Sequence, residues 1–397
     1  MQCDILVAGG GSAGLAAAVS SARAGAKTLL VEHSGALGGM ATQSLVHSIC
    51  GLFKISSQPE VEWANQGFPK EFATRLLEMN GARQPVRMGR VDVMLTVPTI
   101  FSLLADQICD ETPNLEVRLH STIIHAESDL TRLKIHCRGR DEIVHAKAAI
   151  DCTGDGSLAV MAGAEVEQEG ADKLQRPAFI FLIGGVDSVA LTDEDKMKIA
   201  RHIAAAVQMG ELSAVSMGVS FRESGRNGEL YASIDLAGDH DFDPLDGKSL
   251  SQLEFVARQT AAQLVRFFNA RITGFASAYI SQFPARIGVR ESRRVRGKYR
   301  LETSDLETGA TFVDAVALAT WPMELRETAK GPRLRFPHEN RPCDIPLRAL
   351  RANAHDNLFM AGRCISCSHM AQASIRVIGT CLATGETAGI AAARLVR

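Results

Sequence analysis

Residues 5–32 read ILVAGGGSAGLAAAVSSARAGAKTLLVE, and this stretch decides the fold. Residues 5–8 form a short apolar run, which is typical of a buried parallel strand. The glycine-rich turn 9–14 follows, and the alanine-rich stretch 12–24 predicts a helix packed against a sheet. A second apolar run ends at Glu32. Strand, glycine turn, helix and strand in this order make one βαβ unit, which predicts an α/β fold with parallel strands.

The turn matches the G-x-G-x-x-G pattern of dinucleotide-binding folds, in the strand-to-helix context that the pattern requires. We expect Gly9 to make the tight turn, Gly11 to let the backbone approach a pyrophosphate, and Gly14 to let the helix lie close to the strand. The first helical residues, Ser12 and Ala13, offer free N–H groups and a partial positive charge to the phosphates.

Glu32 stands at the end of the second strand, where an acid hydrogen-bonds a ribose hydroxyl. An acid in this position disfavours the 2′-phosphate of NADP. The βαβ unit alone fits FAD and NAD equally. A further glycine-rich stretch, residues 35–42, follows directly and favours the larger, extended cofactor, FAD. We count His33, beside the acid, among the cofactor-binding residues.

The βαβ unit and three later segments resemble the FAD-dependent oxidoreductases of the glutathione-reductase-like Rossmann superfamily, related to fumarate reductase flavoproteins and the flavin subunit of heterodisulfide reductase. The later segments are residues 38–42 (GGMAT), 150–156 (IDCTGDG) and the C-terminal run from 357 (NLFMAGR). Residues 290–294 (RESRR) are also typical of this branch. Besides the turn residues and Glu32, the resemblance implies FAD contacts from Gly38, Gly39, Met40, Ala41, Thr42, Thr153, Gly154, Asp155, Gly362, Arg363 and Ile375.

The resemblance implies an α/β fold with a three-layer, Rossmann-like FAD-binding domain, made of a parallel sheet plus a small β-meander. Apolar runs between residues 123 and 145 predict the meander. Strand-like and helical segments then alternate with an acidic loop at 235–247, which predicts an inserted α+β substrate domain. The expected boundaries are 1–163 and 290–397 for the discontinuous FAD-binding domain and 164–289 for the inserted domain.

Composition excludes several classes of function. The chain has 397 residues, a net charge of −2 and 5% aromatic residues, which argues against nucleic-acid binding. Nine cysteines without even spacing indicate a reducing compartment rather than a disulfide framework. We expect no signal peptide and no membrane span, and therefore a cytoplasmic protein. We expect a small-molecule substrate and an electron acceptor that is oxygen, a quinone or a protein; the oligomeric state stays open.

Three residues are candidates for catalysis. His369 and Arg376 lie near the start of a final helix expected over 372–395, and share one face if the helix has begun at 369. Beside a flavin, His369 could take a proton while a hydride leaves for N5, and Arg376 could anchor a carboxylate. Arg290 is a second candidate anion clamp. The alternatives are a helix cap or cofactor contact for His369, polarisation of a carbonyl for Arg376, and for Arg290 a structural ion pair with Glu291 or the nearby acids.

Cys364 and Cys367 form a C-x-x-C just before the final helix. Thiol–disulfide chemistry there is disfavoured, because the disulfide reductases carry their redox pair elsewhere. Cys/His pairs at zinc spacing are missing, so no metal site is expected. His47 and Cys50 are alternatives for a covalent flavin link, less favoured than a packed loop. The basic run 293–300 is interpreted as a solvated or ion-paired strand.

We therefore expect an FAD-dependent oxidoreductase that transfers a hydride between a small organic substrate and flavin N5, with the substrate between the two domains. One alternative is a flavin monooxygenase acting on a small aromatic substrate. It is disfavoured because those enzymes carry Gly-Asp where this chain has Gly362-Arg363. The other alternative is a flavin-bearing subunit of a larger electron-transfer complex.

Overall fold

A central parallel sheet organises the protein. The structure is a computed structural model that describes all residues except 57, 59, 188–190, 237–241 and 328–330. Five parallel strands follow the order β21-β10-β1-β2-β6. They are β1 (Ile5–Ala8), β2 (Thr28–Val31), β6 (Leu115–Arg118), β10 (Ala148–Asp151) and β21 (Leu358–Met360). Because β1 lies between β10 and β2, the carboxyl ends of these strands meet at a topological switch point, where ligands of open α/β sheets bind.

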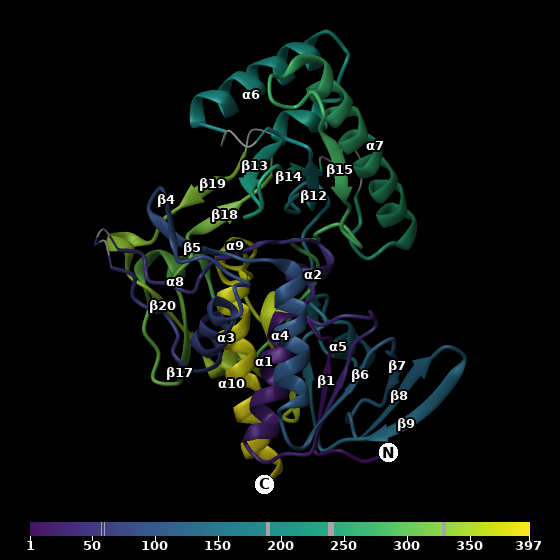
Figure 1. Ribbon diagram of the computed structural model, residues 1–397. Helices are drawn as coiled ribbons and strands as arrows, with labels where there is room; N and C mark the ends of the chain where they lie inside the picture. Colours follow the sequence, from purple (N-terminus) through teal and green to yellow (C-terminus); the bar gives the residue numbers. More distant parts are fainter. Residues whose placement is uncertain (57, 59, 188–190, 237–241, 328–330) are drawn as a thin grey trace.

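Two further layers cover this sheet, since alternate strand residues face opposite sides. Ile5 and Val7 pack with the helices, whereas Leu6 and Ala8 belong to the apolar cluster that includes the meander. The helices are α1 (Ser12–Arg23), α3 (Gly67–Glu78), α4 (Pro98–Asp110) and α10 (Ile378–Val396). The meander consists of β7 (Thr122–Ala126), β8 (Arg132–Cys137) and β9 (Arg140–His145). Figure 1 shows the helices and the meander on opposite sides of β1, which confirms the predicted three-layer fold.

A second, antiparallel sheet lies beyond the edge of the parallel one (Figure 1). Its order is β13-β14-β12-β15, and the helices α6 and α7 cover its outer face. Its elements are β12 (Ala178–Gly184), α6 (Asp193–Gln208), β13 (Ser220–Glu223), β14 (Leu230–Asp235), α7 (Gly247–Arg271) and β15 (Tyr279–Gln282). Phe179 and Phe181 face the helices, whereas Ile180 and Leu182 face Leu45 on the inner side.

This sheet and its helices have the α+β composition expected of the inserted segment, and the boundaries at 164 and 289 stay a prediction. Residues 237–241 of the expected acidic loop lie outside the described residues. The remaining elements are short. They are α2 (Met40–Gln43), β3 (Ser48–Ile49), β4 (Val86–Met88), β5 (Val91–Leu95), α5 (Ser157–Met161), β11 (Val166–Glu167), β16 (Arg294–Val295), α8 (Thr303–Thr308), β17 (Ala315–Ala319), β18 (Met323–Leu325), β19 (Arg333–Arg335), β20 (Cys343–Pro346) and α9 (His369–Ile375).

The end of the chain differs from the expected single helix over 372–395. Two helices, α9 and α10, are separated at Arg376 and Val377. Val377 has extended backbone angles, φ −70° and ψ 152°, and forms the N-cap of α10. Val377 packs against Gly51 at the break, and neither of the two residues there is a glycine or a proline, so the sequence pattern did not reveal it. His369 and Arg376 therefore lie at opposite ends of one short helix.

Candidate cofactor and substrate site

The β1–α1 turn offers open backbone on one side and close packing on the other. Gly11 is the N-cap of α1, and no side chain caps this helix, so its first N–H groups are left for an anion. A Cβ on Gly11 would meet only the Cα of Gly39, at 4.0 Å. In contrast, Gly9 (φ +94°) lies against the Cys152 carbonyl, and Gly14 against the Gly9 carbonyl. This arrangement fits the close approach of a pyrophosphate.

Glu32 is a buried, ionised carboxylate beside this turn. Its Oε2 accepts a hydrogen bond from the Gly10 N–H at 2.6 Å, and its Oε1 accepts from the Ser34 N–H at 2.8 Å. Burial alone would raise the pKa of Glu32, but hydrogen bonds from His33, Ser34 and Gly10 lower it to about 2. The acid thus fixes the end of β2 against the turn, in the position that fits a ribose contact.

The second glycine loop lies directly against the first. The Gly38 N–H donates to the Gly10 carbonyl at 2.8 Å, and Gly11 and Gly38 form an isolated parallel bridge. Gly39 adopts a left-handed conformation with φ +56° and approaches Gly11 so closely that a Cβ would not fit. Thr42 closes the loop with a hydrogen bond from Oγ1 to the Leu37 carbonyl at 2.7 Å. The structure therefore brings residues 38–42 to the turn, with Ala41 buried and Met40 half-buried.

The third segment lies at the end of β10. Oδ1 of Asp151 accepts from the N–H and the hydroxyl of Thr153, at 3.0 and 2.7 Å, and Oδ2 from the Ala159 N–H at 2.9 Å. Burial raises the pKa of Asp151 against these hydrogen bonds. These contacts hold the turn at Gly154 and Asp155, where Gly154 has a φ of +79°.

Arg363 lies over this same turn. Its Nη2 donates to Oδ1 of Asp155 at 2.6 Å, and its Nε donates to the Gly154 carbonyl at 2.8 Å. A Cβ on Gly154 would meet this guanidinium. Gly362 (φ +80°) meets the first turn, because a Cβ there would lie 2.9 Å from that of Ala13. The carboxyl ends of β1, β2, β10 and β21 thus bring together most of the predicted cofactor residues, and Ile375 is the last residue of α9.

Arg286 is a site residue that the sequence did not reveal. Its segment crosses the second glycine loop, since the N–H of Ala285 donates to the Gln43 carbonyl at 2.8 Å. Nη1 of Arg286 lies 3.2 Å from Nε2 of His33, and its buried Nε has no hydrogen-bond partner among the described residues. Burial lowers the pKa of Arg286, while Glu32 raises it. The residue stands alone in the sequence, so no motif could have identified it.

His369 is oriented by a buried acid. Its Nδ1 lies 2.8 Å from Oε1 of Glu291, which is fully buried and also accepts from Nη1 of Arg294 at 2.7 Å. Burial lowers the pKa of His369, but the bond to Glu291 outweighs it and the net shift is upward. In the described part of the chain, Nε2 has no hydrogen-bond partner, and Oε1 of Glu327 lies 3.8 Å away. An acid on one ring nitrogen and a free second nitrogen is the arrangement of a general base.

The two candidate arginines differ in how they are bound. Nη2 of Arg376 donates to Oε1 of Gln175 at 3.0 Å and to the Glu324 carbonyl at 3.2 Å. Its Nε is buried, with no hydrogen bond to any described residue. Arg290 donates from Nη2 to Oδ1 of Asp235 at 2.7 Å and from Nη1 to the Arg176 carbonyl. Arg290 thus forms a structural ion pair, but with Asp235 rather than with Glu291, whereas Arg376 keeps a free donor.

Arg326 connects Arg290 and Arg376 through the shared acids Asp235 and Glu324, in a larger group that no sequence motif revealed. Its Nη1 donates to the second oxygen of Asp235 at 2.7 Å, and its Nε to Oε1 of Glu324 at 2.8 Å. Burial would raise the pKa of Glu324, but Arg326 and Arg376 lower it to about 2. We call this group the arginine cluster. Its members are Arg176, Arg222, Arg290, Arg326 and Arg376. They come from separate segments, so only the fold brings them together.

His47 and Cys50 lie beside the inner face of the antiparallel sheet. The His47 ring stacks on Tyr231 with centroids 3.9 Å apart, and its Nδ1 lies 3.1 Å from the Leu45 carbonyl. Burial lowers the pKa of His47 to about 4, so the ring is neutral. Burial also raises the pKa of the Cys50 thiol to about 12. The covalent flavin link stays an untested alternative for both.

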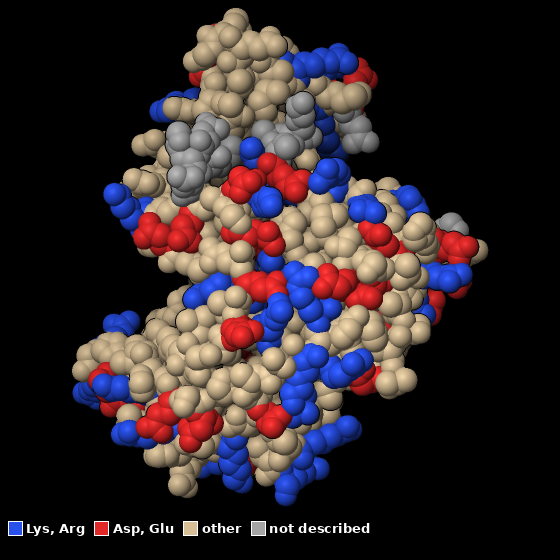
Figure 2. Space-filling model, turned by 180° about the vertical axis from the view of Figure 1, so that it is seen from behind, with Lys and Arg blue, Asp and Glu red and all other residues tan. Residues whose placement is uncertain are grey.

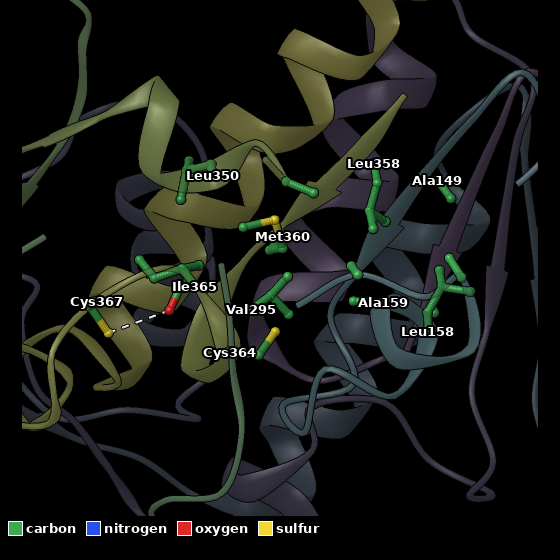
Figure 3. Packing of buried hydrophobic residues seen from close by; sticks show 14 of the residues in the cluster. Ala149, Leu158, Ala159, Val295, Leu350, Leu358, Met360, Cys364, Ile365 and Cys367 are labelled. Atoms are coloured by element: carbon green, nitrogen blue, oxygen red, sulfur yellow. Dashed lines mark hydrogen bonds between the residues drawn. The ribbon is translucent and has the colours of Figure 1, made fainter. Parts of the chain in front are cut away.

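Cys364 and Cys367 are buried in the apolar cluster of the sheet (Figure 3). The two thiol groups lie on opposite sides of Ile365, and that of Cys367 contacts the Ile365 carbonyl at 3.4 Å. The Cys364 thiol contacts the Asp151 carbonyl at 3.5 Å. Burial raises the pKa of Cys364 well above its ordinary value and that of Cys367 to about 12. Raised pKa values favour the protonated thiols, which are poor nucleophiles.

Four of the five basic residues in the run 293–300 pair with acids, and the fifth, Arg293, donates to the Asp155 carbonyl. Arg296 pairs with Glu167, Lys298 with Asp356 at 2.5 Å, and Arg300 with Glu167 at 2.8 Å and with Glu302. On the face drawn in Figure 2, positive and negative side chains are interspersed. This is the ion-paired interpretation made from the sequence. In the described part of the chain no helix is long and apolar enough to cross a bilayer. No group of acid, His and Cys side chains among these residues is placed to hold a metal.

A protein-family model matches nearly the whole chain. The family model described as FAD dependent oxidoreductase matches residues 4–397. A curated protein, the tRNA uridine 5-carboxymethylaminomethyl modification enzyme MnmG of a Nitratiruptor species, is 29% identical over 187 residues. This match covers 43% of the present chain and 27% of that enzyme, so the chain matches about a quarter of the relative's length.

Solved structures are similar at low identity. A geranylgeranyl bacteriochlorophyll reductase-like protein from Thermoplasma acidophilum has 13% identity and a TM-score of 0.44, covering 100% of this chain and 78% of that one. The p-nitrophenol 4-monooxygenase PnpA from Pseudomonas putida has 10% identity and a TM-score of 0.46, covering 94% and 76%. The anhydrotetracycline hydroxylase OxyS from Streptomyces rimosus has 11% identity and a TM-score of 0.47, covering 98% and 62%.

Proposed function

Since this chain belongs to the FAD-dependent oxidoreductase family, we propose that it transfers a hydride between a small organic substrate and N5 of the flavin. When bound, FAD supplies the two-electron chemistry that side chains lack. The observation that carries the proposal is the open backbone at Gly11, where a Cβ would meet nothing nearer than the Gly39 Cα at 4.0 Å, at the start of a helix that no side chain caps. The residues present fit a dinucleotide there.

Each part of the cofactor has candidate partners in this chain. The free N–H groups at Ser12 and Ala13 would hold the pyrophosphate, as at other helix N-termini. Glu32 would accept from a ribose hydroxyl. Arg286 adds a half-buried cation beside this acid, with a free Nε–H for a phosphate oxygen. The turn at Gly154 and the loop 38–42 line the same edge of the sheet.

The substrate would bind between the inner face of the antiparallel sheet and the edge of the parallel sheet. His369 would accept the substrate proton at Nε2, while Glu291 keeps the proton of Nδ1 in place. Arg376 would anchor the substrate through its free donor. Arg290 acts as a positioning residue, because it holds Asp235 of β14 and thereby the inserted sheet.

Anaerobic mixing tests this proposal. The purified FAD-loaded protein is mixed with small organic compounds, and flavin reduction is followed as loss of the visible flavin absorbance. In a second series the reduced protein is mixed with the oxidised counterparts of these compounds, and reoxidation is followed as return of this absorbance. Reduction or reoxidation by one such compound supports hydride transfer. Oxygen uptake that requires NADPH and an aromatic compound would instead establish the monooxygenase. Electron exchange only with a co-purifying protein would establish the electron-transfer subunit.

A further inference from the structure

The arginine cluster carries more positive charge than its own acids neutralise. Asp235 accepts from Arg290 and Arg326, and Glu324 accepts from Arg326. The other three guanidiniums contact no carboxylate of the described residues. Nη1 of Arg222 donates to the sulfur of Met88 at 3.0 Å. Arg376 donates to an amide and a carbonyl, and Arg176 to a carbonyl.

This excess charge is removed from water. The Nε of Arg376 and the Nη1 of Arg176 are buried, and neither has a hydrogen-bond partner in the described chain. Burial and the neighbouring Arg290 lower the pKa of Arg376 to about 10, and burial lowers that of Arg222. A buried guanidinium donor without a hydrogen-bond partner is unfavourable, and a bound anion would satisfy this donor and add negative charge beside it.

Arg222 and Arg376 border the same apolar cluster. Arg222 lies on β13 of the inserted sheet and donates to Met88, whereas Arg376 follows α9 and precedes Val377. Met88 and Val377 pack in one cluster together with Cys50. Both guanidiniums also lower the pKa of the Cys50 thiol, although burial and Glu324 outweigh them. An anion between them would therefore meet one donor from each part of the molecule.

An apolar wall adjoins these cations. On the antiparallel sheet, Arg222 pairs in register with Tyr231, which pairs in turn with Leu182. These side chains share the inner face, where Tyr231 and Leu182 pack against Leu45. The neutral His47 covers the Tyr231 ring and adds no charge of its own. A ligand that fits this site has a negative head and an apolar body.

We propose that Arg222 and Arg376 bind the carboxylate of an organic-acid substrate, whose apolar part lies against Tyr231 and Leu182. The neighbouring guanidinium of Arg326 already binds two carboxylates, and the planar fork of an arginine suits this group. The inference rests on the proposed function, because it places the substrate in the same site.

Calorimetric titration of the FAD-loaded protein tests the proposal directly. Acetate, hexanoate, phenylacetate and succinate are compared with neutral hexanamide and phenylacetamide and with phenyl phosphate. We expect at least one acid to bind about tenfold or more tightly than its amide. Preference for the phosphate would overturn the carboxylate assignment. Equal binding of acid and amide, or no binding of any acid, would overturn the site.

Variants locate the binding. Arg222→Gln and Arg376→Gln should each weaken the best acid about tenfold or more, with FAD content and thermal unfolding as checks of folding. Arg83→Gln is the matched control, because Arg83 pairs at the surface with Glu223, the next residue on β13. Unchanged affinity in both cluster variants would contradict the assignment. If an acid binds but reduces no flavin, the carboxylate site is supported and the proposed hydride transfer is contradicted. If only neutral compounds reduce the flavin, hydride transfer is supported and the carboxylate site is contradicted.

Discussion

Nδ1 of His369 lies 2.8 Å from a carboxylate oxygen of Glu291, an acid with no exposed surface. The two residues come from different segments, the start of α9 and the chain before β16. Glu291 is itself held by Arg294 and by the Gln175 N–H. This pairing fixes which ring nitrogen carries the proton and leaves Nε2 as the acceptor.

His369→Gln should slow flavin reduction by substrate, because it removes the proton acceptor. A positioned general base contributes about 10² to 10⁴ in rate, so a loss of this size is expected in rapid-mixing measurements. FAD content should stay that of the wild type, because His369 contacts none of the glycine turns. His136→Gln on the meander, an exposed histidine also paired with an acid, is the control. An unchanged rate in the His369 variant removes it from the mechanism.

The rate of flavin reduction should rise with pH through a value above 6.5, the ordinary pKa of histidine. Glu291 raises the pKa of His369, and only the neutral ring accepts a proton. The same ion pair stabilises the fold below 6.5, and this contribution is lost as pH rises through the raised pKa. Glu291→Gln should move the rise in rate to lower pH. A wild-type midpoint below 6.5 would speak against the pairing.

Gly11→Ala and Gly14→Ala should separate cofactor binding from folding. Gly11 has φ −67°, which alanine adopts, and its Cβ would meet nothing nearer than Gly39 at 4.0 Å. We expect a stability cost of about 1 kcal/mol or less, with weakened FAD binding. Gly14→Ala would press a Cβ into the Gly9 carbonyl and should cost about 1–3 kcal/mol or more. Thermal unfolding and FAD titration measure both; full FAD affinity in Gly11→Ala contradicts the placement of the pyrophosphate.

Glu32 should contribute stability that disappears in acid. Burial raises the pKa of this carboxyl. The hydrogen bonds from His33, Ser34 and Gly10 outweigh burial and lower the pKa from 4.5 to about 2. Its contribution is therefore present above about 4.5 and is lost as pH falls through about 2. Unfolding by denaturant at a series of pH values should show a shallower acid dependence for Glu32→Gln than for the wild type. Identical slopes would contradict an ionised Glu32.

Cys364 and Cys367 should play no part in electron transfer. Both thiols are buried and protonated, and each contacts a backbone carbonyl. The variant with Cys364→Ala and Cys367→Ala should keep its FAD and its rate of flavin reduction. Mass spectrometry of the native protein after alkylation should find both thiols unmodified. A Cys364–Cys367 disulfide that forms on flavin reoxidation would revive the thiol alternative.

Much of the fold followed from local patterns. The run from Ile5 to Glu32 predicted the βαβ unit, since strand, tight turn and helix are specified by neighbouring residues. The break at Val377 was not predictable, because it depends on packing against Gly51. Arg222 and Arg326 were missed for a similar reason. Each is an ordinary arginine in its own segment, and only the fold brings β13 and the chain after β18 to one site.

The visible absorption spectrum of the purified protein tests the central claim most directly. We expect flavin bands that correspond to one FAD per chain and that return when FAD is added back after its removal. In Gly11→Ala these bands should be weaker, because less FAD is bound. A colourless protein that takes up no added FAD while its fold is intact would contradict the account.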